Sequence, residues 1–176
     1  MNRITDMRTP ALLMISGLSL AISACATLPT SSTDTSSSPA STATPAPVPG
    51  YDWFLHLDGS EARLAYGLRD SDDLRLGMDC RRGSGRLELS ATGAARARPE
   101  IHIESDGETG RYPAESETSE LHDGVFLTAH ANTGAPVFQR FRSVGWLAHW
   151  QDGDRHAYAA QRGSRETIER FFAFCG

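Results

Sequence analysis

Residues 64–85 read LAYGLRDSDDLRLGMDCRRGSG, and this stretch predicts two antiparallel strands. Apolar side chains recur at every second position, which places them on one face of a strand. The acidic and small residues at 70–73 are typical of a turn, and Gly83 and Gly85 supply the permissive backbone of a second hairpin. The alternating residues are Leu64, Tyr66 and Leu68 in the first strand and Leu74, Leu76, Met78 and Cys80 in the second.

The same period of two continues along the chain in both directions. Turn signals at 106–107 and 152–154 separate some of the later runs. Short strands at this spacing favour an antiparallel sandwich or barrel. Further strands are expected at 53–57, 87–89, 101–103, 125–130, 146–150 and 156–160.

Residues 135–144 break the pattern, because their apolar side chains follow a helical spacing. Pro136 suits the first turn of a helix, where its missing amide hydrogen has no partner to lose. The segment predicts a short helix near 136–143, and a strand is the alternative. The apolar residues are Val137, Phe138, Phe141 and Val144.

The last residues of the chain predict a second helix. Ser164 is a suitable N-cap, and Glu166 and Glu169 lie early enough to favour the helix dipole. Gly176 follows the last turn. One apolar face is formed by Ile168, Phe171, Phe172 and Cys175, at i, i+3, i+4 and i+7.

Residues 1–24 have the layout of a secretory signal. Arg3 and Arg8 precede an uncharged apolar run at 11–24, which is short of the roughly 20 residues that a membrane-spanning helix needs. The run ends in Ile22-Ser23-Ala24-Cys25. This ending resembles the lipobox of bacterial lipoproteins, in which the signal is cleaved before the cysteine and the cysteine is acylated.

The lipobox resemblance implies a lipid anchor on Cys25, with palmitate among its acyl chains, and multiple chains suffice for stable anchoring. Ala26 follows, where an aspartate in the resembling family favours inner-membrane retention. The resemblance therefore implies the outer membrane, with the domain facing the periplasm. The alternatives are a retained transmembrane helix and an ordinary signal peptide followed by a free cysteine.

Residues 26–50 are rich in serine, threonine and proline, and Asp34 is their one charged residue. Such a segment buries too little apolar surface to offset the entropy of ordering, so we expect a disordered tether from Cys25 to residue 50. Residues 51–176 then form a single β-rich domain. The net charge of −5 argues against nucleic-acid binding.

Cys80 and Cys175 both lie on faces that are predicted to point into the core. Export permits oxidation, so a disulfide is expected, and two buried free thiols are the alternative. Residues 64–85 and the closing ERFFAFC resemble a group of small exported proteobacterial proteins. This resemblance supports the strand pair and the cysteine pairing, and it implies no activity.

Catalytic and metal-binding patterns are absent from the sequence. Ser84 lies in a turn-like GSG, and the acidic residues Asp72, Asp73 and 115–120 are expected to be solvated loop charge. We therefore expect no enzyme activity, cofactor or metal. None of the six histidines lies in a metal-ligand spacing: His56, His102, His122, His130, His149 and His156.

Five arginines cluster around the GSG hairpin and its exit, and they predict an anion-binding patch. Guanidinium groups bind phosphate and carboxylate in a bidentate manner. The alternative is that Asp79, Glu88 and Glu100 neutralise the cluster within the fold. The five are Arg81, Arg82, Arg86, Arg96 and Arg98.

Residues 78–89 and Gly110-Arg111-Tyr112 faintly resemble lysozyme-inhibitor lipoproteins, which are small disulfide-bonded β-barrels. The tyrosine that this family carries before the cysteine is missing. The expected function is that of an outer-membrane-anchored periplasmic lipoprotein with a non-enzymatic binding or envelope-structural domain. Its expected partners are the membrane and an anionic envelope component or a periplasmic protein. A lysozyme-inhibitor-like domain is the alternative, and a cell-envelope hydrolase is less favoured.

Overall fold

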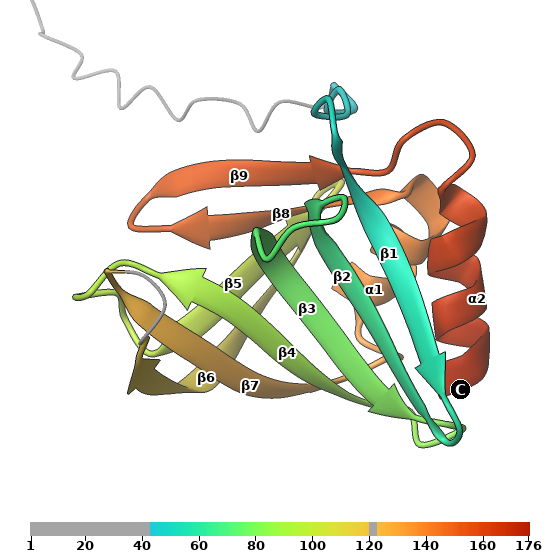
Figure 1. Cartoon of the computed structure of the whole chain (residues 1–176), viewed down its shortest axis with the longest axis horizontal. Coiled ribbons are helices and arrows are strands. Elements are labelled where there is room, and N and C mark those ends of the chain that lie inside the picture. Colours follow the sequence, from blue (N-terminus) through green and yellow to red (C-terminus); the bar gives the residue numbers. More distant parts are fainter. Residues whose placement is uncertain (1–42, 120–122) are drawn as a thin grey trace, which may run out of the picture. The chain divides into compact units, whose positions relative to one another are not determined.

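The computed structural model describes residues 43–119 and 123–176, in which nine antiparallel strands form one sheet (Figure 1). The sheet has the order β1-β2-β3-β4-β7-β6-β5-β8-β9 and curls into a nearly closed barrel. The mainly β prediction is confirmed, and the barrel is the form that the fold takes. The strands are β1 (Tyr51–Asp58), β2 (Glu61–Leu68), β3 (Leu74–Arg81), β4 (Arg86–Gly93), β5 (Glu100–Ser105), β6 (Glu108–Thr118), β7 (Val125–Asn132), β8 (Trp146–Gln151) and β9 (Asp154–Ala159).

The β5–β6 and β8–β9 hairpins are both closed by an Asp-Gly pair, as their sequences predict. Asp106 and Gly107 have φ angles of 43° and 89°, and Asp152 and Gly153 have 51° and 97°. Two successive positive φ angles are the signature of a type I′ turn, which matches the twist of the flanking strands. These turns fix the register of β5 against β6 and of β8 against β9.

Strand β6 was not predicted from the sequence, and the expectation of loop charge at 115–118 is wrong. Its residues Glu108–Pro113 pair with β5, whereas Ala114–Thr118 pair with β7. Pro113 stands where the partner changes, a position at which a missing amide hydrogen is tolerated. The strand therefore connects β5 to β7 within the sheet, while its acidic side chains remain exposed.

The edges of the barrel, β1 and β9, are joined by side chains. The indole Nε1 of Trp53 donates a hydrogen bond to the carbonyl of Tyr158 at 3.2 Å, and Asp52 accepts one from the amide of Gln161 at 3.0 Å. The ring of Trp53 also packs against Phe141, with centroids 4.8 Å apart. These contacts link the open edge to the helical layer.

The two predicted helices are confirmed as α1 (Pro136–Val144) and α2 (Arg165–Cys175). Both bury their expected apolar faces, and α2 lies along β1 in Figure 1. Ser164 occupies the N-cap position but makes no capping bond, because its hydroxyl donates to Asp52 instead. That bond fixes the start of α2 to β1.

Cys80 and Cys175 are joined in the structure, with Cα atoms 5.8 Å apart, which fits the predicted disulfide. Two backbone hydrogen bonds extend the contact, from Gly83 N to Phe174 O at 2.9 Å and from Gly85 N to Cys175 O at 2.8 Å. The β3–β4 turn and the chain end therefore form one seam.

Two details differ from the sequence-based expectation. Leu68 and Leu74 do not join the buried face of their strands, because the register shifts at Tyr66/Gly67. Leu68 is 36% exposed and Leu74 is 40% exposed. The domain also starts before Tyr51, since the Gln161 side chain donates to the carbonyl of Val48 at 2.7 Å. The predicted signal, Cys25 and the tether up to residue 42 lie outside the described residues.

Candidate ligand pocket

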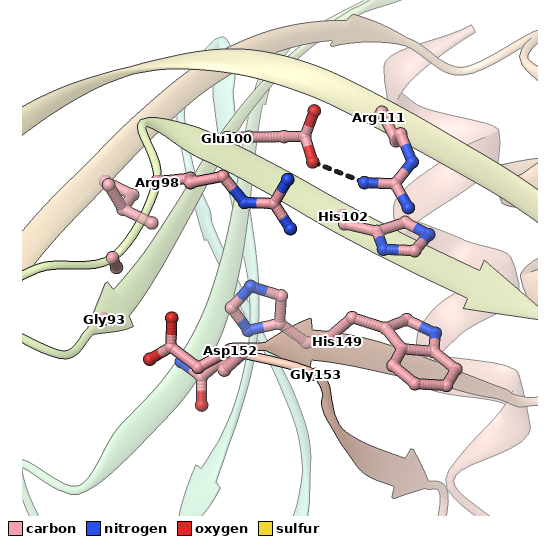
Figure 2. A pocket seen from close by; sticks show the side chains of 12 residues that line it. Gly93, Arg98, Glu100, His102, Arg111, His149, Asp152 and Gly153 are labelled. Atoms are coloured by element: carbon pink, nitrogen blue, oxygen red, sulfur yellow. Dashed lines mark hydrogen bonds and ion pairs between the residues drawn. The ribbon is translucent and has the colours of Figure 1, made fainter.

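A pocket of about 280 Å³ opens at the end of the barrel where β4 stops and β8 turns into β9. We call it the β4–β8 pocket. The side chain of Gln151 donates to the carbonyl of Thr92 and so holds these two strands together across the pocket. The lining residues are Gly93, Ala97, Arg98, Glu100, His102, Arg111, Leu127, His149, Trp150, Gln151, Asp152 and Gly153 (Figure 2).

His149 is the most deeply buried polar residue of the pocket. It lies on β8 two residues after Leu147, on the same inward face, and is 1% exposed. Its Nδ1 atom has no hydrogen-bond partner in the described part of the chain. Desolvation, followed by the nearby His156 and His102, lowers the pKa of His149 to about 4. The ring is therefore neutral at pH 7.

His102 and Trp150 form an aromatic wall on the neighbouring strands. Their rings stack with centroids 5.8 Å apart and an interplanar angle of 15°. His102 Nε2 also lies 2.9 Å from the hydroxyl of Thr109. Burial and then the charge of Arg111 lower the pKa of His102, so this ring too favours its neutral form.

The two arginines of the pocket differ in their partners. Arg111 on β6 binds Glu100 on β5 at 2.6 Å. Arg98, on the loop before β5, has no ion pair or side-chain hydrogen bond to any described residue. Figure 2 shows its guanidinium extending over the pocket, with the His149 ring on the other side. Arg98 is therefore the cation that remains available to a ligand.

The lining contains few groups of the kind that cleave bonds. No serine, threonine, cysteine or lysine lines the pocket within the described residues, and its carboxylates are Glu100 and Asp152. Glu100 is held by Arg111, and a neutral histidine with a pKa of about 4 is a weak general base. Among the residues that the structure describes, no group of three potential ligands could hold a metal ion.

The structure does not bring the five predicted arginines together. Arg81, Arg82 and Arg86 surround the β3–β4 turn, whereas Arg96 and Arg98 follow the other end of β4. The eight residues of β4 separate the two groups by roughly 24 Å. The expectation of one anion-binding patch is wrong, because residues before and after the same strand lie at opposite ends of the sheet.

The three arginines at the turn are also partly balanced. Arg81 lies 4.0 Å from Glu61, and Arg82 stacks over the ring of Phe174 at 4.1 Å. Arg86 lines a shallow surface groove shared by both signs of charge. The charged and titratable residues of this groove are His56, Asp58, Glu61, Arg63, Asp79, Arg81, Arg86, Glu88 and His130.

The remaining sequence candidates lie elsewhere. Ser84 only bonds within its turn, where its hydroxyl donates to the carbonyl of Arg86. The two segments of the lysozyme-inhibitor resemblance lie on β3–β4 and on β6, and β7 separates them. Sequence reasoning missed His149 as a site residue, although alternation in WLAHWQ already places it beside Leu147 on an inward face.

Comparison of the chain with protein-family models, with curated proteins and with solved structures finds no match. Within the residues that the structure describes, neither helix is long and apolar enough to cross a membrane.

Proposed function

We propose that this protein is an outer-membrane lipoprotein whose periplasmic domain binds a small ligand in the β4–β8 pocket and catalyses no reaction. The lipobox-like ending at Cys25 supports the anchor and the location. The observation that carries the binding role is His149, a buried ring whose Nδ1 has no partner among the described residues, at the wall of an open pocket.

The energetic cost of this histidine supports a binding role. A buried polar group without a hydrogen bond costs about 1–3 kcal/mol, and folded proteins pair nearly all such groups. Leu127 is buried in the wall of the same pocket, so the surroundings of His149 accommodate apolar side chains. A ligand that gives the Nδ1 of His149 a hydrogen-bond partner would compensate this cost in the complex.

The pocket lies at the end of the sheet where the chain enters. Antiparallel pairing of β1, β2, β3 and β4 puts Tyr51 and Gly93 at the same end, three strands apart. The turn of Arg82 and the chain end are at the opposite end. The chain therefore enters the domain at the end of the barrel that contains the pocket.

The test is to recover the ligand. The full chain is expressed in its own envelope, purified, denatured, and its small molecules are identified by untargeted mass spectrometry. We expect a compound that co-purifies with the wild type and is depleted at least tenfold with Arg98→Gln. Arg96→Gln is the matched control, because Arg96 is exposed on the same loop and does not line the pocket. Equal recovery from all three proteins would contradict the proposal.

A further inference from the structure

The charges around the β4–β8 pocket select the sign of its ligand. Arg111 is already balanced by Glu100, and Arg98 is not paired with any described residue. Asp152, the other carboxylate of the lining, lies on the exposed tip of the β8–β9 turn. No described carboxylate raises the pKa of His149; besides burial, its pKa is lowered by His156 and His102. Arg98 and Asp152 are the charges of the lining that have no ion pair among the described residues; Asp152 lies out on the exposed turn, whereas Arg98 extends over the pocket in Figure 2, so an anion in the pocket meets Arg98.

The neutral ring of His149 supplies the second contact. A neutral imidazole has one N–H donor and one acceptor nitrogen, and a guanidinium has only donors. A carboxylate accepts from both at once, and hydrogen bonds to an ionised acceptor are about twice as strong as neutral ones. In Figure 2 the ring and the Arg98 guanidinium border the same space.

The remaining wall is apolar and narrow. Ala97 and Leu127 line it, and Leu127 is 2% exposed. Gly93 keeps the wall tight, since a Cβ atom added there would lie 3.0 Å from that of Ala97. A volume of about 280 Å³ is at the lower limit of small-molecule sites, so the body of the ligand is short.

We infer that the β4–β8 pocket binds a small organic acid: Arg98 holds the carboxylate, His149 donates a hydrogen bond to it, and a short apolar body lies against Ala97 and Leu127. The inference rests on the proposed binding function and names its ligand class.

The experiment is an NMR titration of the full chain, purified in detergent and labelled with ¹⁵N-histidine. The probes are butyrate, inorganic phosphate, butyramide and butylamine at equal ionic strength. We expect butyrate to shift the His149 resonances saturably and to bind at least tenfold more tightly than the other three. Arg98→Gln should weaken butyrate binding at least tenfold, and Arg96→Gln should leave it unchanged.

The other outcomes are distinguishable. If butyramide or butylamine shifts His149 more tightly than butyrate, the pocket binds ligands but the organic-acid class is wrong. If phosphate binds as tightly as butyrate, the site takes a bare oxyanion and the apolar body is wrong. If no probe shifts His149 in a protein with an otherwise folded spectrum, both the ligand class and the proposed binding function are contradicted.

Discussion

His149 shows how a single residue can oppose the stability of its own fold. The side chain is 1% exposed, its Nδ1 has no partner in the described residues, and its neighbours at Leu147 and Ile103 are core residues. Native proteins rarely keep such a group without a role. The Nδ1 of His149 lacks the partner that a buried histidine usually has within the protein, and this is the ground for its proposed binding role.

Replacing His149 by leucine, a side chain of similar size, should stabilise the free protein. The substitution removes a buried polar group without a partner, and we expect the free energy of unfolding at pH 7 to rise by about 1–2 kcal/mol. Chemical denaturation of wild type and His149→Leu measures the change. A loss of more than 1 kcal/mol would instead mean that the imidazole contributes a contact that the fold needs.

The pKa of His149 also predicts how stability depends on pH. Burial lowers this pKa from the usual 6.5 to about 4, so below pH 6.5 the unfolded chain binds a proton that the folded protein does not. Stability should therefore fall as the pH decreases from 6.5 to 4, by about 3 kcal/mol in total from this residue.

Denaturation curves collected between pH 7 and pH 4 for wild type and His149→Leu isolate this contribution. The variant should keep the general acid loss of stability and lack the part due to His149. Parallel curves for the two proteins would show that His149 titrates normally.

At the level of elements, the contact between α2 and the β3–β4 hairpin holds the chain end. The Cys80–Cys175 pair, two backbone hydrogen bonds and the stacking of Arg82 on Phe174 all lie in this seam. The α2 helix covers the interior along the open edge of the barrel, and Phe171 and Phe172 are 0% and 1% exposed. Separation of α2 from the β3–β4 hairpin would therefore expose core residues of both the helix and the barrel.

Removing the disulfide should destabilise the domain strongly. The bond closes a loop with a sequence separation of 95 residues, for which chain entropy predicts about 4.7 kcal/mol. The double variant Cys80→Ala/Cys175→Ala avoids a lone thiol, and its denaturation midpoint should fall accordingly. Alkylation of the wild type without reductant, followed by intact-mass measurement, should modify neither Cys80 nor Cys175. Modification of both in a folded protein would disprove the bond.

At the level of the whole molecule, the proposed location of the protein rests on Cys25, which lies outside the described residues. If the lipobox-like ending is processed as proposed, Cys25→Ser prevents lipid attachment. The variant should leave the membrane fraction or accumulate as an uncleaved precursor, because acyl chains supply the membrane affinity. Fractionation of cells followed by immunoblotting makes the measurement. Normal maturation and membrane partition of the variant would refute the anchor.

Much of the fold could be predicted because the relevant signals are local. Alternation, Asp-Gly turns and the apolar faces of two helices depend on neighbouring residues, and these predictions are confirmed. Strand β6 was missed because its outward positions are acidic and its inward positions, such as Tyr112 and Ala114, are only partly buried. Its pairing with two different strands produces no repeating pattern in its own sequence.

Spacing along the chain was enough to predict the β class, the faces on which Cys80 and Cys175 lie, and the lipobox-like ending at Cys25. Which charges meet depends instead on the folded arrangement of the strands. It separated Arg81 from Arg98 by the length of β4, and it joined Arg111 to Glu100. It also placed His149 in one pocket with Arg98, which lies on the distant loop before β5. Strand order decides these contacts, and strand order follows from long-range packing of the whole barrel, which no local pattern encodes.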